Sequence, residues 1–236
     1  MSNVETTSRA TEDYLKAIYG LSSRGEQVTT GHLASVLGVS SPSVTAMVKR
    51  LESGRLIARP DARLLRLTDR GETLALAVVR RHRLLETFLS SVLGVPWDEV
   101  HEEAERLKHV LSERLEERID AHLGHPTHDP HGDPIPPRTG RHVEAWGPAL
   151  DAAPTGSRFL VERVSDRDSD ALRYLGELGI RPGASLRVEE QAPFGGPRWI
   201  RVDDGERLAL GAALTRVIHG RVQVEPSDDD GASMPR

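Results

Sequence analysis

Hydrophobic positions recur with the period of an amphipathic helix over residues 10–22, where positions 15, 18, 19 and 21 are apolar. A second short helix is predicted over residues 30–37, because Gly38 follows it and glycine commonly ends helices. After a three-residue turn, Ser41 is expected to cap a third helix, with Pro42 at its first helical position.

The third predicted helix has two different faces. One face is apolar and predicts contact with a core, through Val44, Met47, Val48 and Leu51. The opposite face is small and polar and becomes basic toward its end, with Ser43, Thr45, Ala46, Lys49 and Arg50. Two short helices across a tight turn, the second with such a face, are typical of a helix-turn-helix.

Two short alternating segments, about 55–59 and 64–68, flank the turn "PDAR" and predict a β-hairpin that carries Arg59, Arg63 and Arg66. Such a hairpin is placed like the wing of a winged helix, which contacts the phosphate backbone. Residues 41–83 contain ten Lys and Arg but four acids, although the whole chain has a net charge of -5. Small winged-helix domains also bind proteins, but the local positive charge favours double-stranded DNA as the partner.

Two longer helices are predicted next, over residues 69–93 and 97–123, with Gly124 ending the second. The second helix has one apolar stripe at helical spacing, made of Val100, Ala104, Leu107, Leu111, Leu115 and Ile119. Two such helices exceed what the core of a small DNA-binding domain needs. They favour a helical homodimer interface, because paired operator half-sites require a two-fold partner.

The C-terminal part of the chain has a different pattern. Residues 125–154 are rich in Pro, Gly and His, which predicts an ordered turn followed by a linker, and His125, His128, His131 and His142 are interpreted as loop residues. From residue 156, alternating segments predict a small β-barrel with one short helix, and Asp204-Gly205 favours a tight hairpin. The predicted fold is mainly α with β, in segments 1–71 (winged helix-turn-helix), 72–140 (helical), 141–155 (linker), 156–224 (β-barrel) and 225–236 (disordered tail).

Composition limits the chemistry that the chain can perform. No run of about 18 apolar residues exists and the N-terminus lacks an apolar signal core, so we expect a cytoplasmic protein without membrane contact. The chain contains no cysteine, which excludes disulfides and thiolate ligands, so a metal site must use histidine and carboxylates.

Hard ligands cluster in three places. His82 and Glu86 are spaced i, i+4 in one predicted helix, and His101, Glu105 and His109 are spaced i, i+4, i+8 in the next. The first helix offers Asp13, with Glu12 beside it. Such residues often form exposed pairs, but two sets on consecutive helices indicate a metal site. Nitrogen and oxygen ligands suit manganese, iron(II), zinc or cobalt, and the carboxylates favour manganese(II).

Several motifs, in this order, resemble the diphtheria toxin repressor family: "TEDYLKAIY", "SSPSVTAMVKRL", "RRHRLLETFL", "VHEEAERLKHVLS" and "DPHGDPIP". The resemblance covers residues 10–222 and implies a metal-activated repressor of metal-uptake genes with an SH3-like C-terminal domain. It implies an ancillary metal site of His82, Glu86 and His101, which Asp168 of the C-terminal domain would complete. The resemblance implies a second ligand from that domain, but its position falls near Ala171, whose side chain has no ligand atom.

The resemblance also implies a primary metal site of Asp13, Glu105 and His109. Iron-sensing members of the family have a methionine and a cysteine at the positions that match Asp13 and Glu105. This chain has carboxylates at both positions and so resembles the manganese-sensing members. Ligand positions of the family carry Lys16 and Lys108 here, and a divalent ion about 6 Å from one ammonium is repelled by about 5 kcal/mol at an effective dielectric of 20. We therefore expect a weak or rearranged primary site and favour the ancillary set.

The family pattern maps the DNA contacts to the first turn of the second helix, the third helix and the hairpin, at Thr30, Gly31, Ser40, Pro42, Ser43, Thr45, Arg50 and Arg63. Two other classes stay open: a metal-independent winged-helix regulator, which Lys108 favours, and an iron-responsive repressor. A zinc hydrolase is disfavoured, because Glu105 replaces the second histidine of H-E-x-x-H. We expect no enzyme activity and no small-molecule substrate.

Overall fold

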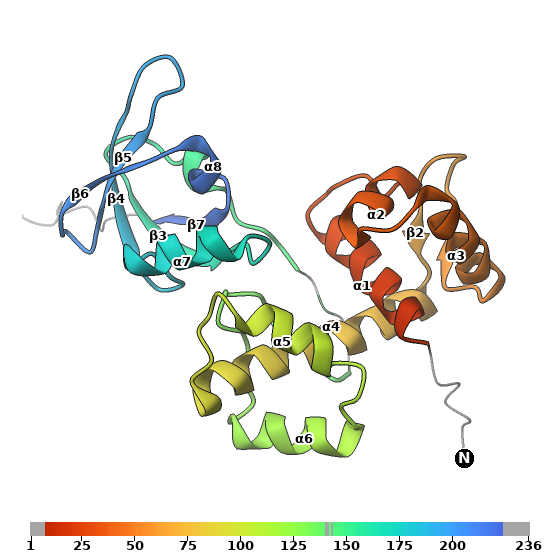
Figure 1. Ribbon diagram of the computed structural model, residues 1–236. Helices are drawn as coiled ribbons and strands as arrows, with labels where there is room; N and C mark the ends of the chain where they lie inside the picture. The colour runs from red at the N-terminus through yellow and green to blue at the C-terminus, as the bar shows by residue number, and fades with distance from the viewer. Residues whose placement is uncertain (1–7, 140–141, 143, 224–236) are drawn as a thin grey trace, which may run out of the picture. The chain divides into compact units, whose positions relative to one another are not determined.

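The computed structural model describes residues 8–139, 142 and 144–223, so the predicted tail over 225–236 lies outside the described residues. It divides into two compact units, Met1–Trp146 and Gly147–Arg236. Figure 1 shows a helical first unit and a second unit built around a sheet. The elements of the first unit are α1 (Arg9–Ser23), α2 (Thr30–Leu37), α3 (Ser41–Ser53), β1 (Ile57–Ala58), β2 (Arg66–Leu67), α4 (Asp69–Leu93), α5 (Val100–Leu107) and α6 (Glu113–His122).

The three N-terminal helices form around a core as their apolar periodicity predicts. Buried side chains from all three, among them Leu15, Leu33 and Val48, pack in one cluster. The predicted cap of α3 is wrong by one residue: Ser40 is the N-cap, and its hydroxyl accepts a hydrogen bond from the N–H of Ser43. Ser40 is extended, which leaves its side chain free to reach the first turn, and Ser41 and Pro42 are already helical.

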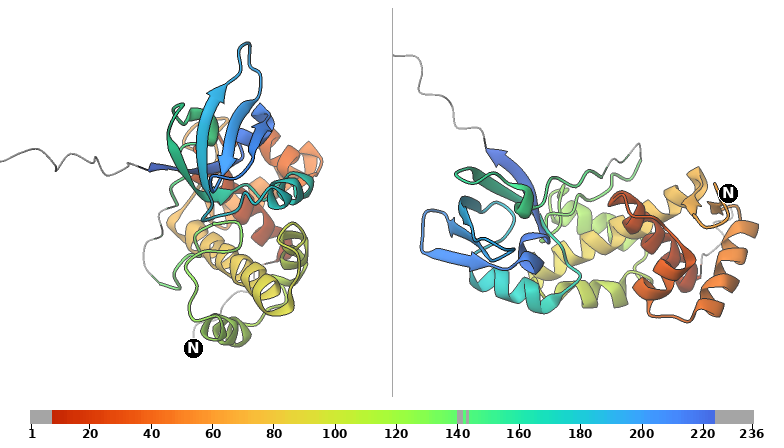
Figure 2. Two further views of the ribbon diagram at one scale, coloured as in Figure 1. Left: turned by 90° about the vertical axis from the view of Figure 1, so that its left-hand side faces the viewer. Right: turned by 90° about the horizontal axis from the view of Figure 1, so that it is seen from above.

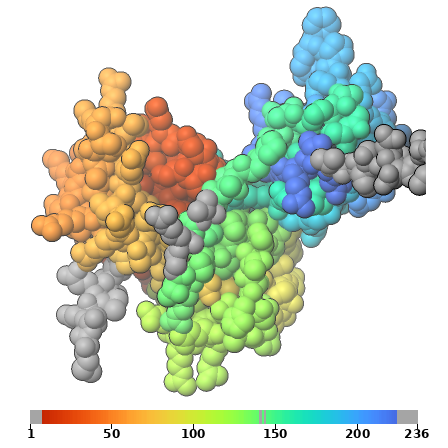
Figure 3. Space-filling view, turned by 180° about the vertical axis from the view of Figure 1, so that it is seen from behind, coloured from red at the N-terminus to blue at the C-terminus, as the bar shows by residue number. Residues whose placement is uncertain are grey.

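The β1–β2 hairpin follows α3, with Ile57 paired to Leu67 and Ala58 paired to Arg66. Figure 3 shows its turn, in light orange, projecting from the surface of the first unit. The hairpin leads directly into α4, which packs against α1 over its N-terminal part, as the two views of Figure 2 show. Gly71 makes this junction possible, because a Cβ there would lie 1.9 Å from the carbonyl oxygen of Leu56.

The single helix predicted over residues 97–123 is wrong. The chain forms α5, then a turn over residues 108–110, then α6 after two further connecting residues. Ser112 starts α6, because its hydroxyl accepts a hydrogen bond from the N–H of Leu115. The predicted apolar stripe is correspondingly broken: Val100, Ala104 and Ile119 are buried, whereas Leu107 and Leu115 are exposed. Helical periodicity does not distinguish one long helix from two short helices with the same average spacing.

The segment after α6 is more ordered and more deeply buried than a turn and linker would be. Gly124 has a left-handed backbone, His128 and Pro134 form a β-bridge, and Ile135 joins the core formed by α4, α5 and α6. Two arginines of α4 hold this segment, since Arg80 donates to the carbonyl of Pro136 at 2.8 Å and Arg83 donates to that of Pro134 at 2.6 Å.

The second unit contains an antiparallel five-stranded sheet with the strand order β6-β5-β4-β3-β7. Its elements are η1 (Leu150–Ala152), β3 (Arg158–Val164), α7 (Ser169–Glu177), β4 (Ser185–Gln191), β5 (Arg198–Val202), β6 (Arg207–Leu210), α8 (Ala212–Thr215) and β7 (Ile218–Gln223). Asp204-Gly205 connects β5 to β6, which pair antiparallel. The strands β3 and β7 approach closely at Gly220, where a Cβ would lie 2.0 Å from the carbonyl oxygen of Leu160. The buried sheet face carries the core of this unit, including Phe159, Val161 and Ile200.

Candidate metal centre and DNA-binding surface

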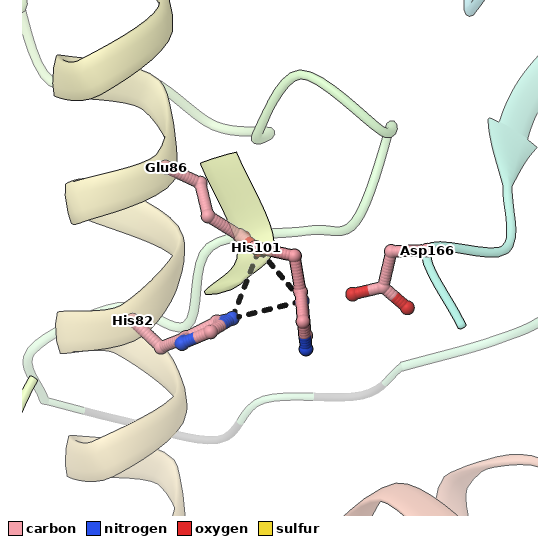
Figure 4. Close-up of side chains that lie close together, drawn as sticks. All are labelled: His82, Glu86, His101 and Asp166. Atoms are coloured by element: carbon pink, nitrogen blue, oxygen red, sulfur yellow. Dashed lines mark hydrogen bonds and ion pairs between the residues drawn. The ribbon is translucent and has the colours of Figure 1, made fainter. Parts of the chain in front are cut away.

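Three of the predicted metal ligands converge between α4 and α5. His82 and Glu86 lie one turn apart on α4, and His101 lies in the first turn of α5 (Figure 4). Oε1 of Glu86 lies 2.9 Å from Nε2 of His82 and 3.0 Å from Nδ1 of His101, and these two nitrogens are 3.3 Å apart. The structure therefore brings the predicted ancillary ligands of the first unit together around one carboxylate oxygen.

The protonation of this cluster suits a cation. His82 and Glu86 are almost fully buried, with 2% and 1% of their surfaces exposed. Burial lowers the pKa of His82 to about 4, although the carboxylate of Glu86 partly opposes that shift. His82 is therefore neutral at pH 7, and the neutral imidazole is the form of histidine that binds a metal ion.

A second cluster shares Glu86 and was not predicted. Asp129 and His131, in the loop after α6, are buried, and their ligand atoms and one of Glu86 all lie within 4.8 Å of one another. Nε2 of His131 lies 2.6 Å from the carbonyl oxygen of Trp97. Because a carbonyl oxygen only accepts hydrogen bonds, this nitrogen is the donor, and Nδ1 of His131 carries the lone pair in a neutral ring.

Each residue of this second cluster presents a buried ligand atom that makes no hydrogen bond within the described part of the chain. These atoms are Oε2 of Glu86, Oδ2 of Asp129 and Nδ1 of His131. Buried polar atoms rarely lack hydrogen bonds, because desolvation without a partner costs about 1–3 kcal/mol. Burial, and then the charges of Asp133 and Glu86, raise the pKa of Asp129 well above its usual value. A bound cation would contact the ligand atoms that lack hydrogen bonds and would stabilise the charged form of the Asp129 carboxyl, so these residues fit a metal ion.

The loop that carries Asp129 and His131 is fixed to α4. Arg83 lies between this loop and the segment that follows it, and its Nη2 lies 3.3 Å from Oδ2 of Asp133 and 3.0 Å from Oε1 of Glu144. The carboxylate Oδ1 of Asp129 accepts hydrogen bonds from the N–H groups of His131 and Asp133, both at 2.9 Å. The motif "DPHGDP" offered a signal for this site, but its histidine lacks helical or strand register, so periodicity could not assign it.

The predicted primary ligands also meet, but around an ammonium group. The amino nitrogen Nζ of Lys108 contacts Glu105 and lies 2.9 Å from Oδ1 of Asp13. Nε2 of His109 lies 2.9 Å from the same oxygen of Asp13, and Nζ of Lys16 lies 2.5 Å from Oε2 of Glu105. His109 follows the end of α5, so the predicted three-residue helical row does not exist, and a turn brings His109 to α1 instead.

The electrostatics of this group disfavour a divalent ion. Burial alone would raise the pKa of Glu105, but Lys16, and then His82 and Lys108, outweigh burial and hold that pKa at about 2. The two carboxylates of Asp13 and Glu105 thus face two lysines. A divalent ion about 4 Å from one ammonium is repelled by about 8 kcal/mol at an effective dielectric of 20. With both lysines in place, the residues present do not fit a metal ion.

Asp168 and the predicted DNA-contact residues lie elsewhere. Asp168, in the second unit, caps α7, and its carboxylate accepts hydrogen bonds from the N–H groups of Asp170 and Ala171. The predicted DNA-contact residues lie at the start of α2, along the exposed face of α3 and in the hairpin: Thr30, Gly31, Ser40, Pro42, Ser43, Thr45, Arg50 and Arg63. All are exposed except Thr30, which is half-buried. The hydroxyl of Thr45 donates to the carbonyl of Ser41 at 3.0 Å, which leaves its methyl group for outward contact.

Comparison with known proteins identifies the class of this fold and site. Residues 6–59 match the N-terminal DNA binding domain of iron dependent repressors, and residues 68–137 match the metal binding and dimerisation domain of the same repressors. Residues 149–222 match the FeoA domain. No helix in the described residues is long and apolar enough to cross a membrane.

Full-length relatives agree with these matches. The iron-dependent repressor IdeR of Mycobacterium leprae is 39% identical over 195 residues, which cover 76% of this chain and 83% of that protein. The diphtheria toxin repressor of Corynebacterium diphtheriae is 39% identical over 195 residues, with coverages of 77% and 84%. The chain belongs to the diphtheria toxin repressor family of metal-dependent, DNA-binding transcriptional repressors, and the predicted resemblance is confirmed.

Solved structures of the same family share the fold. A manganese-dependent transcriptional repressor in complex with manganese is 41% identical, with a TM-score of 0.83 and coverages of 90% of this chain and 100% of that one. The manganese regulator SloR is 36% identical, with a TM-score of 0.76 and coverages of 90% and 98%. The family is one of transcriptional regulators, which agrees with the expectation that the chain is not an enzyme.

Proposed function

We propose that this protein is a homodimeric repressor whose DNA binding responds to manganese(II) held by Glu86 and the residues around it. The observation that carries the proposal is the set of buried ligand atoms on Glu86, Asp129 and His131 that make no hydrogen bond within the described residues. His82 and His101 contact the other oxygen of Glu86. Glu86 thus belongs to two groups of candidate ligands, one with His82 and His101 and the other with Asp129 and His131. A cation bound to Glu86 would join α4, α5 and the loop after α6.

The ligand chemistry favours manganese over the alternatives. The candidate ligands are imidazole nitrogens and carboxylate oxygens, and the chain has no cysteine that would favour softer metals. Two similar solved structures are described as a manganese-dependent repressor and a manganese regulator, whereas the relative from Mycobacterium leprae is described as an iron-dependent repressor. Iron(II) is therefore the second candidate, and competition between the two ions at the same site distinguishes them.

For DNA binding, we propose a winged helix-turn-helix in which α3 enters the major groove and the β1–β2 hairpin lies along the phosphate backbone. The exposed start of α3 has small side chains, which permits close approach and contact with thymine methyl groups. Arg50 and Arg63 would contact phosphates, so affinity should fall steeply with salt. The same eight residues predicted from the family pattern are those that we propose contact DNA.

A homodimer would present two α3 helices to successive major grooves, about 34 Å apart. The helical part of the first unit exposes apolar side chains that such an interface would cover, at Val92, Leu93, Leu107, Val110 and Leu115. For the second unit we propose an SH3-like barrel. Because the carboxylate of Asp168 is engaged in capping α7, our proposed ligand set is confined to the first unit.

The test begins with selection of a binding site from a pool of random double-stranded DNA by the manganese-loaded protein. Affinity for the selected duplex is then measured by fluorescence anisotropy, with manganese(II) and with a chelator. We expect a loss of at least tenfold in the chelator, and loss of this response in Glu86→Gln. The matched control is Glu103→Gln, which removes an exposed carboxylate of α5 and should keep the response.

A metal-independent regulator is the second candidate function, and the buried Lys108 favours it. This candidate predicts equal DNA affinity with manganese(II) and with the chelator, for both the wild type and Glu86→Gln. This candidate would be excluded if manganese(II) raises the DNA affinity of the wild type but not that of Glu86→Gln.

A further inference from the structure

Lys108 is a buried cation in the first unit. Its side chain is 0% exposed, although lysine is almost never fully buried unless its charge is paired. The pairing groups are the carboxylates of Asp13 on α1, at 2.9 Å, and Glu105 on α5. The ammonium therefore joins two helices that are distant in the sequence.

The backbone of Lys108 is also hydrogen-bonded on both sides, so the point from which its side chain extends is fixed. The N–H of Lys108 donates to the carbonyl of Ala104 at 2.9 Å, and the carbonyl of Lys108 accepts a hydrogen bond from Arg81 of α4 at 3.1 Å. Arg81 also lies 3.9 Å from Glu12 of α1. Residues from α1, α4 and α5 thus meet at Lys108.

Lys16 completes the arrangement from the α1 side. Its Nζ lies 2.5 Å from Oε2 of Glu105, while Lys108 contacts Oε1 of the same carboxylate. Each oxygen of Glu105 therefore has an ammonium partner. Together with Asp13, two negative charges face two positive charges, so the group is balanced without any bound ion.

We infer that Lys108 replaces a metal ion at the Asp13–Glu105–His109 position and fastens α1 to the end of α5 at every metal concentration. The inference rests on the proposed function in one respect: it leaves the cluster around Glu86 as the place where metal acts. The helix that begins the DNA-binding part is then held permanently by a lysine. In this chain, metal would regulate only the α4–α5–loop contacts around Glu86.

The test is a calorimetric titration of the metal-free, full-length protein with manganese(II). Wild type is compared with Lys108→Glu, which removes the ammonium and supplies a third carboxylate. We expect the variant to bind one more ion per chain than wild type. Arg106→Glu is the matched control, because it makes the same charge change two residues away on α5, where the side chain is 65% exposed, and it should add no ion.

Asp13→Asn distinguishes a site occupied by the ammonium of Lys108 from a site that binds a metal ion. Added to Lys108→Glu, it should abolish the additional ion; in the wild-type background it should lower the unfolding temperature and leave the number of bound ions unchanged. Loss of one ion from wild type on Asp13→Asn would overturn the inference. So would equal ion numbers for wild type and Lys108→Glu.

The two proposals fail in different ways. If wild type binds no manganese but Lys108→Glu gains an ion that depends on Asp13, the proposed function is wrong and the inference about Lys108 stands. If Lys108→Glu does not fold in the chelator, Lys108→Met is prepared by refolding with manganese(II). This neutral variant should bind the additional ion through Asp13, Glu105 and His109, and absence of that ion would refute the inference.

Discussion

Replacing His82 by glutamine should change how the stability of the metal-free protein depends on pH. Burial lowers the pKa of His82 from 6.5 to about 4 in the folded protein. Between these values the unfolded chain binds a proton at His82 and the folded chain does not, so stability is fully present above about pH 6.5 and is lost as the pH falls toward 4. The expected loss is about 2 kcal/mol between about pH 7 and about pH 5, and about 3 kcal/mol over the whole range.

The assay is urea unfolding of the metal-free protein in a chelator, followed by the far-ultraviolet circular dichroism of the helical first unit. Wild type should lose about 2 kcal/mol more than His82→Gln between about pH 7 and about pH 5. Comparing the change with pH, and not the absolute stability, removes the packing cost of the substitution. His125→Gln is the control, because that histidine side chain is 74% exposed, and it should retain the wild-type pH dependence. Equal pH dependence in wild type and His82→Gln would refute the assignment of His82 as a neutral, buried ligand.

Three further predictions concern the loop, the hairpin and the junction before α4. Burial raises the pKa of Asp129, so protons compete more strongly for its carboxylate than for an ordinary one; manganese(II) should therefore bind more weakly as the pH falls, measured by calorimetric titration at several pH values. Arg63→Ala should lower affinity for all DNA sequences alike and reduce the slope of log affinity against log salt by about 1, measured by anisotropy at several salt concentrations. Gly71→Ala should destabilise the first unit by at least about 2 kcal/mol in urea unfolding, because the added Cβ would lie 1.9 Å from a carbonyl oxygen.

Local signals predicted much of the fold. The bounds of α2 and α4 follow from an apolar period that ends at Gly38 and Gly94, both of which have left-handed backbones. The division between α5 and α6 was not predictable in the same way. There the apolar spacing continues through the break, and the side chain of Lys108 points to α1. That tertiary contact overrides the helical period, which describes only neighbours in the sequence.

The site was predicted unevenly for a related reason. His82, Glu86 and His101 lie on helices, so their spacing indicated that they share faces. Asp129 and His131 lie in an irregular loop, where spacing predicts nothing and position depends on the ion pairs of Arg83 with Asp129, at 3.8 Å, and with Asp133, at 3.3 Å. For them, burial in the structure supplied the evidence that sequence could not. Our expectation of a rearranged primary site rested on the charge of two lysines, and the ion pairs in the structure support it without testing metal binding.

The most direct test of this account is a crystal structure of the manganese-loaded protein, with diffraction data collected at the manganese absorption edge. We predict an anomalous difference peak beside the carboxylate of Glu86 and no such peak between Asp13 and Glu105, where the ammonium of Lys108 should remain. A peak bound by Asp13, Glu105 and His109, or the absence of a peak at Glu86, would contradict the account.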